Sequence, residues 1–176
     1  RQDGVDEGVK VFPPKHFRSL SDRLLTLASR HDRRCSVLAI AIPGEKSSKR
    51  DDAIREITDI VRTTDALCGL EDGDLLLFLP ETTGLGAQVC RRCILAKLQG
   101  DRRVRNRQGG AVSSGRGGQD SARLPITVSV GVATFPHDGN TLRRLVKLAR
   151  ARAADDARSS VHALGLDGMP LAELVD

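Results

Sequence analysis

Aromatic side chains are scarce in this chain. Its 176 residues include no tryptophan, no tyrosine and only four phenylalanines, although 39% of the residues are hydrophobic. A chain of this length fits one domain and is long enough to bury a sizeable core. We therefore expect one core built from leucine, valine, isoleucine and alanine.

Long apolar runs are also missing. No uninterrupted apolar stretch approaches the roughly 20 residues that a membrane-spanning helix needs, and the first residues do not form a signal-peptide pattern. The cysteines fall inside expected strands or a helix, without a second Cys or His pair at zinc spacing, and they are Cys35, Cys68, Cys90 and Cys93. We interpret them as buried free thiols in a reducing cytoplasm, with metal or redox chemistry as the alternative.

Common nucleotide-binding and catalytic signatures are absent as well. The chain contains no G-x-G-x-x-G and no Walker-type Gly-Lys-Ser/Thr sequence. Its histidines are scattered, and neither a Ser-His-Asp nor a Cys-His arrangement is present. These residues point to no catalytic site of those classes.

Positive charge exceeds negative charge, with 28 Lys and Arg against 23 Asp and Glu. The excess is concentrated between Asp101 and Arg123, in a stretch rich in Gly and Ser. Because such a stretch has few apolar residues to bury, we interpret residues 99–123 as a flexible basic insertion. It could instead contact nucleic acid, an acidic protein or a nucleotide, but it lacks aromatic stacking partners, and we do not expect nucleic acid as a partner.

Helix and strand patterns alternate along the rest of the chain. Periodicity predicts helices over Lys15–Ser29, from a cap at Asp51 or Asp52 to about Thr64, over Gly84–Leu98 with Leu85, Val89 and Cys93 inward, and over Leu142–Asp156. Expected strands are Cys35–Ile42, Ala66–Leu70, Leu75–Leu79, Leu124–Phe135 and an edge strand at Ser160–Leu164. The core β-α-β-β-α-β order predicts a ferredoxin-like α+β fold, an α/β sandwich whose central, mostly antiparallel sheet has helices on its faces.

A hairpin organises the chain. Two apolar strands flank the acidic turn Glu71-Asp72-Gly73-Asp74, and a Gly-containing polar break of this kind is a hairpin signal. The second strand, Leu75–Leu79, is apolar throughout, which favours burial on both faces. Just upstream, Arg62 and Asp65 are spaced R-x-x-D where a helix gives way to the first strand.

Three segments of the chain form a recognisable set: Arg62-Thr-Thr-Asp65 five residues before the turn, Leu75–Thr82 (LLLFLPET), and Ile126–Gly139 (ITVSVGVATFPHDG). Together they resemble the GGDEF domain of diguanylate cyclases. The resemblance spans roughly residues 10–161. It implies the nucleotide-cyclase fold and a role in signal transduction by cyclic di-GMP, a bacterial second messenger.

At the signature itself this chain departs from the family. The Gly-Gly-Asp-Glu-Phe positions read Glu71-Asp72-Gly73-Asp74-Leu75. In the family the glycines let the turn approach GTP phosphates, whereas carboxylates repel them. The partner metal-binding Asp falls near Ala41-Ile42, where no carboxylate exists, and Mg²⁺ needs more than one oxygen ligand. The comparison implies a degenerate signature, with no catalytic residues, no GTP or Mg²⁺ cofactor and no cyclase activity.

Further positions of the family's GTP site also differ. The Asn-Asp…Gly-His segment that recognises guanine is missing between Lys46 and Asp65. In the last helix, Ala149-Arg150 stands where the family has Ala-Asp, and Ala157 stands where a phosphate-binding Lys is expected. These differences strengthen the expectation that the chain is not an enzyme.

The resemblance implies that Arg62 and Asp65 bind cyclic di-GMP in an inhibitory-type site. Arginine presents a fork to guanine acceptors, and a carboxylate accepts from guanine N–H groups. Arg91 and Arg92, on the helix after the hairpin, are the candidate helpers, although the family's position aligns with Cys93. Alternatively, Asp65 only caps the turn and Arg62 is a solvated cation near a helix C-terminus.

We therefore expect a catalytically inactive GGDEF-like regulatory domain that binds cyclic di-GMP and signals to a neighbouring domain or partner protein. The alternatives are a ligand-free interaction or dimerisation domain, a homodimer included, and a residual diguanylate cyclase that uses GTP. We assign residues 1–10 to a linker, 11–164 to the domain with its insertion 99–123, and 165–176 to a C-terminal tail, and we expect a cytoplasmic protein.

Overall fold

The structure, a computed structural model, describes residues 11–44, 47–99 and 126–163. The expected linker, nearly all of the basic insertion and the C-terminal tail lie outside these residues. No helix in the described ranges is long and apolar enough to cross a membrane.

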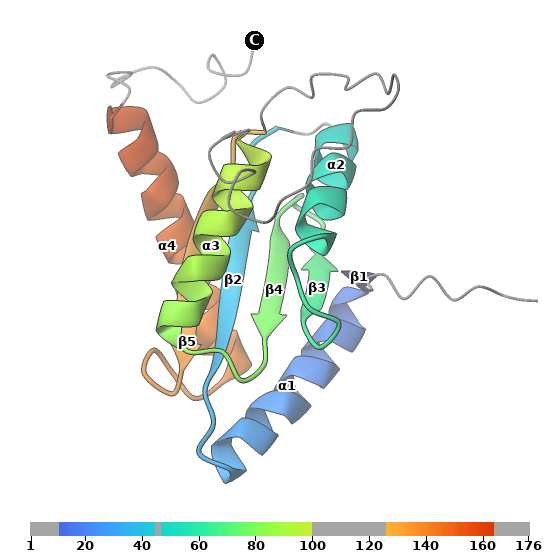
Figure 1. Ribbon diagram of the computed structural model, residues 1–176, viewed down its shortest axis with the longest axis vertical. Coiled ribbons are helices and arrows are strands. Elements are labelled where there is room, and N and C mark those ends of the chain that lie inside the picture. The colour runs from blue at the N-terminus through green and yellow to red at the C-terminus, as the bar shows by residue number, and fades with distance from the viewer. Residues whose placement is uncertain (1–10, 45–46, 100–125, 164–176) are drawn as a thin grey trace, which may run out of the picture.

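One five-stranded sheet carries the described part of the chain (Figure 1). The strands are β1 (Val11–Phe12), β2 (Cys35–Ala41), β3 (Ala66–Gly69), β4 (Leu75–Leu79) and β5 (Ser129–Phe135); the helices are α1 (Pro14–Arg30), α2 (Ser47–Thr58), α3 (Gly84–Leu98) and α4 (Leu142–Ala163). Their order across the sheet is β1-β3-β4-β2-β5. Apart from the parallel pair of β1 with β3, the pairs are antiparallel, which confirms the ferredoxin-like α+β fold.

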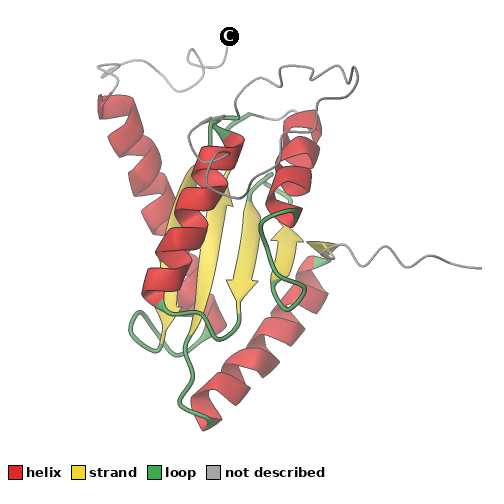
Figure 2. Ribbon diagram, in the orientation of Figure 1, coloured by secondary structure: helices red, strands yellow, loops and turns green. Residues whose placement is uncertain are grey.

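Helices cover both faces of the sheet, α1 and α4 one face and α2 and α3 the other (Figure 2). Strand β4 serves both cores, as its continuous apolar run predicts. Leu75 and Leu77 pack toward α2 and α3, and Leu76 and Phe78 pack toward α1 and α4. All of them are at most 5% exposed, so the hairpin is anchored by a fully buried strand.

Gly131 lets α4 pack directly on β5. A Cβ atom at this position would lie 1.9 Å from the carbonyl oxygen of Ala149 and 2.4 Å from the amide nitrogen of Ala153. No side chain fits in that space, so the glycine is required by close helix-to-strand contact. The packing fixes the position of α4 along the sheet and, with it, the arginines on that helix.

The ends of the chain differ from the sequence-based prediction. Val11 and Phe12 form a short strand that pairs with β3 and is not among the predicted strands. Strand β5 begins at Ser129, several residues later than predicted, and α4 continues to Ala163. The edge strand expected over Ser160–Leu164 is therefore wrong. Its apolar run is too short for periodicity to separate a strand from the end of a helix.

Helix α2 begins earlier than predicted, and α3 buries a different side from the predicted one. Helix α2 begins at Ser47, so Asp51 and Asp52 lie inside it and do not cap it. In α3, Leu85 and Val89 are 78% and 44% exposed rather than inward. This helix is apolar on more than one side, and the small residue Ala87 lies inward, which lets the backbone approach the sheet.

Candidate functional site

The hairpin turn is the first part of the candidate site. Gly73 has a φ of +94°, a conformation that glycine adopts without strain. The turn is closed by main-chain hydrogen bonds from Leu70 to Asp74 (2.8 Å) and from Gly73 to Leu70 (3.2 Å). The amide of Asp74 also donates to the Asp72 carboxylate at 3.2 Å, so the acidic side chains help to shape the turn.

A guanidinium from α4 bridges the two aspartates of the turn. Nη2 of Arg150 donates to a carboxylate oxygen of Asp72 and, at 3.2 Å, to one of Asp74. The main-chain N–H of Ile42, just beyond β2, donates to Asp74 as well. The chain's own cation therefore lies between the carboxylates that would otherwise face a ligand.

The Asp74 carboxyl group has a raised pKa. Burial is the largest cause and the charge of Asp72 adds to it, while Arg150 and the Ile42 N–H act in the opposite direction. A group that retains its proton more readily is a poorer metal ligand, because metal binding requires the ionised carboxylate.

The donor set of this turn does not fit a magnesium ion. Within the described ranges, no group of three or more His, Cys, Asp or Glu side chains could hold a metal ion. Asp72 and Asp74 provide oxygens, but both are bound to Arg150, and the neighbouring positions Ala41 and Ile42 offer no side-chain oxygen.

The Arg62–Asp65 turn is the second part of the candidate site. The N–H of Arg62 donates to Oδ2 of Asp65 at 2.8 Å, and the N–H of Asp65 donates to the carbonyl oxygen of Arg62 at 3.0 Å. Asp65 is 7% exposed, and burial raises its pKa, opposed by the N–H and the charge of Arg62. Asp65 therefore caps the turn, as the alternative interpretation predicts for this residue.

The Arg62 side chain behaves differently from Asp65. It is exposed, and it forms no ion pair or hydrogen bond through its guanidinium with any other described residue. Its charge does act on Asp65 and on Cys90, so the guanidinium lies near both side chains. The turn thus combines a fixed, buried carboxylate with a free cationic fork.

Arg91 does not join Arg62. Its Nε donates to the carbonyl oxygen of Val130 at 2.8 Å, and its Nη2 bonds Asp156 at 2.6 Å, so the side chain is committed to β5 and α4. Arg92 is exposed, and no contact in the described part of the chain brings it to Arg62. The structure therefore leaves Arg62 and Asp65 without Arg91.

Thiols of α3 lie toward the Arg62–Asp65 turn. The pKa of Cys90 is raised to about 11, first by burial and then by the charges of Asp65 and Cys93, while Arg62 lowers it. Both cysteines are free and half-buried. The side of α3 that faces the turn therefore offers sulfur, in agreement with the alignment that places Cys93 where the family has an arginine.

The sequence reasoning missed the role of Arg150. The residue was recognised as a departure from the family, but its contact with Asp72 and Asp74 spans 78 and 76 positions of the chain. Charge complementarity between an arginine and an acidic turn was visible in the sequence. Only the packing of α4 on Gly131 determines that this arginine is the one that reaches the turn.

Comparisons with known proteins place this geometry in context. No family model matches the chain, and no curated protein matches it either. Solved structures do match. The GGDEF domain of YfiN, also called TpbB, from Pseudomonas aeruginosa has a TM-score of 0.68 at 17% identity, covering 90% of each chain. The active GGEEF domain of a diguanylate cyclase from Vibrio cholerae has a TM-score of 0.67 at 9% identity, covering 85% of this chain and 93% of that one.

A third similar structure includes a partner. The diguanylate cyclase SiaD from Pseudomonas aeruginosa, solved in complex with its activator SiaC, has a TM-score of 0.61 at 19% identity, covering 85% of this chain and 56% of that one. The described part of this chain is an α+β domain with a five-stranded mixed sheet, and its TM-scores to these structures show a shared fold. More specifically, the chain has the fold of a GGDEF domain.

Proposed function

We propose that this chain is a GGDEF-like regulatory domain that does not synthesise cyclic di-GMP and instead binds it at Arg62 and Asp65. In this proposal the bound nucleotide changes how the domain contacts a neighbouring domain or partner protein. The existence of SiaD in complex with an activator supports the idea that a protein with this fold can work through protein contacts.

The bridge from Arg150 to Asp72 and Asp74 is the observation that carries the proposed loss of cyclase activity. A cyclase must bring GTP phosphates and a cation to the signature turn. Here the turn presents carboxylates, which repel phosphates, and a tethered guanidinium already lies between them. Neither the metal ligation nor the close backbone approach that the chemistry needs is supported by these residues.

The free guanidinium of Arg62 supports the proposed nucleotide binding. Arg62 is exposed and unpaired within the described ranges, beside a carboxylate that the turn holds in place. The Oδ1 atom of Asp65 has no hydrogen-bond partner in the described part of the chain and could accept from a guanine N–H. Arginine and carboxylate together match the acceptor and donor edges of guanine.

A ligand-free interaction domain is the second candidate. The Oδ2 atom of Asp65 is already used by the N–H of Arg62, and Arg91 is held by Val130 and Asp156. A site limited to Arg62 and one carboxylate oxygen would have fewer charged contacts than the complete inhibitory-type site. Residual GTP cyclisation is the third candidate, and no contact of the hairpin turn favours it.

Calorimetric titration of cyclic di-GMP tests the proposal. We expect binding to the unsubstituted chain and a loss of affinity of about tenfold or more for Arg62→Ala, because hydrogen bonds to charged groups contribute about 1.5–3 kcal/mol. Arg18→Ala is the matched control, since Arg18 is an exposed, unpaired arginine of α1, on the other face of the sheet. It should bind like the unsubstituted chain.

The titration separates the candidates. An absence of heat with cyclic di-GMP would favour the ligand-free domain. Equal affinity for Arg62→Ala and the unsubstituted chain would move the binding site away from Arg62. Formation of cyclic di-GMP from GTP and Mg²⁺ would contradict the proposed inactivity and favour the residual cyclase.

A further inference from the structure

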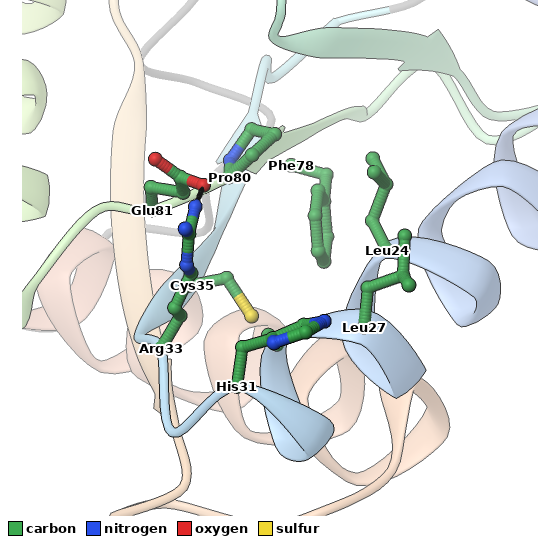
Figure 3. Close-up of a pocket in the computed structure, with 9 residues that line it drawn as sticks. Leu24, Leu27, His31, Arg33, Cys35, Phe78, Pro80 and Glu81 are labelled. Atoms are coloured by element: carbon green, nitrogen blue, oxygen red, sulfur yellow. Dashed lines mark hydrogen bonds and ion pairs between the residues drawn. The ribbon is translucent and has the colours of Figure 1, made fainter.

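An apolar cavity opens at the end of the sheet opposite the hairpin turn. It has a volume of about 280 Å³ and lies between the end of α1 and the end of β4. Figure 3 shows Leu24, Leu27 and Phe78 around it, with the sulfur of Cys35 beside them and Pro80 at its edge. The nucleotide proposal does not involve any of these residues.

The size of the cavity limits what it can hold. Pockets for small molecules and cofactors usually measure about 300–1,000 Å³, so this cavity is at the lower limit and is too small for a dinucleotide. Its lining side chains are mostly aliphatic and aromatic. A single large apolar group, such as a Leu, Phe or Trp side chain, matches both properties.

Charged side chains lie at the mouth of the cavity and beside it. Arg33 and Glu81 form an ion pair on one side of it, and His31 lies below it in Figure 3. Arg30 and Arg34 precede and follow the stretch His31–Arg33. Both are exposed, and neither forms an ion pair with another described residue. The segment 30–34 reads Arg-His-Asp-Arg-Arg, so three arginines stand against one aspartate and the segment beside the cavity carries an excess of positive charge, although Glu81 pairs with Arg33.

Leu27 extends the apolar surface out of the cavity. It is 50% exposed and is the exposed large apolar residue of α1. Arg23 lies four residues before it and Arg30 three residues after it, so both are its neighbours on the helix surface. An apolar centre with cations on both sides matches a ligand that is apolar in the middle and negative at its flanks.

Two backbone positions at the rim are held in an unusual conformation. Asp32 has a φ of 50° and Glu81 a φ of 49°, in the left-handed region that residues other than glycine rarely adopt. Such positions persist where surrounding structure enforces them, and they cluster at binding and functional sites. They hold Arg33 and Glu81 on the two sides of the ion pair.

We propose that this cavity binds one large apolar side chain from an acidic segment of a partner protein. The apolar side chain fills the space between Leu27 and Phe78, and the flanking Asp or Glu residues contact Arg30, Arg33 and Arg34. This surface is separate from the turns that flank β3. It gives the domain a route to a protein partner whether or not a nucleotide binds at Arg62.

Other occupants match these observations less well. A second copy of the chain carries a net charge of +5 and would be repelled by the same rim. A lipid surface would need a wider apolar face, whereas Leu27 is the one large apolar residue exposed on α1. Nucleic acid supplies negative charge but no aliphatic anchor for the cavity.

A random 12-residue peptide library, displayed and selected on the immobilised 176-residue chain, tests the proposal. We expect the selected peptides to share one large apolar residue flanked by Asp or Glu. A selection that yields no binders, or binders without acidic enrichment, overturns the proposal. So does binding to vesicles of anionic phospholipid that is as strong as binding to the best peptide and equally dependent on Leu27.

Matched variants then locate the binding surface, with fluorescence polarisation of the best selected peptide as the readout. Leu27→Asp should weaken binding about tenfold or more, as expected for a central apolar contact. Leu85→Asp, which changes an exposed leucine of α3, is the control and should leave binding unchanged. Equal affinity for the two variants overturns the proposal, and circular dichroism confirms that both are folded.

Charge substitutions provide an independent readout. Arg34→Glu should weaken peptide binding several-fold and reduce its salt dependence, and Arg92→Glu on α3 is the matched control. Glu81→Gln should strengthen binding, because it removes a negative charge that competes for Arg33. Unchanged or weaker binding by Glu81→Gln contradicts the proposed role of the rim.

Discussion

Two turns at opposite ends of the sheet use similar residues with opposite electrostatic results. In the turn after β5, Asp138 accepts two hydrogen bonds of 2.9 Å from Arg152 and one of 2.8 Å from the Thr134 N–H, and its pKa is lowered to about 2. In the hairpin turn, Asp74 is also bound by an arginine of α4 and by a main-chain N–H, yet its pKa is raised.

Burial is the first cause of the raised pKa of Asp74, whereas hydrogen bonds from Arg152 are the first cause of the lowered pKa of Asp138, and the way the arginine charge is shared adds to this difference. Arg152 directs both of its terminal nitrogens at Asp138, whereas one nitrogen of Arg150 serves both Asp72 and Asp74. The fold therefore pairs the Asp138 carboxylate with a whole guanidinium, and it leaves the hairpin turn with an excess of negative charge. Perturbed carboxyl groups of this kind cluster at functional sites, which is why we interpret the hairpin turn as the remnant of a site rather than as a stabilising feature.

The largest expected effect on stability is at Asp138, in the turn after β5. Asp138→Asn should lower the free energy of unfolding by about 2 kcal/mol at pH 7, because it removes charge-assisted hydrogen bonds to a carboxylate that is 10% exposed. Urea denaturation of the variant and the unsubstituted chain measures the difference. A loss below about 0.5 kcal/mol would contradict the assigned role of Asp138.

The pH dependence of that loss follows from the direction of the pKa shift. The folded pKa of Asp138 lies below its unfolded value, so its stabilisation is fully present above about pH 4 and is lost as pH falls toward 2. The gap between the unsubstituted chain and Asp138→Asn should therefore close over this range. A gap that stays constant down to pH 2 would assign the loss to geometry rather than charge.

Substituting Arg152 of α4 should lower the stability more than substituting Arg150 of the same helix. Arg152→Gln removes the double contact with Asp138 and a 2.6 Å hydrogen bond to the carbonyl oxygen of Val132, and we expect a loss of about 1–2 kcal/mol. Arg150→Gln should cost less than about 1 kcal/mol, because a single nitrogen of Arg150 serves two carboxylates that repel each other. Thermal and urea denaturation compare the pair; a larger loss for Arg150→Gln would reverse the comparison.

Asp74→Asn should change stability by no more than about 0.5 kcal/mol at pH 7. The substitution weakens the bond to Arg150, but it also removes a buried negative charge beside Asp72. Because the folded pKa of Asp74 is raised, ionisation destabilises the folded chain as pH rises through that pKa, opposite in sign to Asp138. Denaturation between pH 3 and 7 should show Asp74→Asn gaining relative to the unsubstituted chain, and a progressive relative loss would disprove this.

The smallest expected effect is within the hairpin turn. Asp72→Asn removes the like charge next to Asp74 and should lower the pKa of Asp74. An NMR titration of the Asp74 side chain measures the change. A higher pKa in the variant would show that Asp72 acts mainly by orienting Arg150, not by repulsion.

Much of the fold was predictable from local pattern. The continuous run Leu75–Leu79 predicted a strand buried on both faces, and the structure confirms it. Threonine before a helix is a common N-cap, and the Thr83 hydroxyl accepts from the amide of Gly86 at the start of α3. The orientation of α3 could not be read in the same way, because Leu85 and Val89 are as apolar as the buried Ile94.

The candidate site was predictable only in part. The spacing of Arg62 and Asp65 identified a turn that the structure does form. The partners of the arginines could not be read from spacing, since Arg91 bonds β5 and α4, and Arg150 bonds a turn more than 70 positions away. These contacts depend on how helices pack across the sheet, which a linear pattern does not encode.

An NMR titration of the isotope-labelled chain tests the separation of roles most directly. We predict that cyclic di-GMP shifts the amide resonances of Arg62–Asp65 and leaves those of Glu71–Asp74 in place, and that GTP with Mg²⁺ shifts neither set. Shifts of Glu71–Asp74 on addition of GTP and Mg²⁺ would show that the hairpin turn still binds substrate, and would contradict the account.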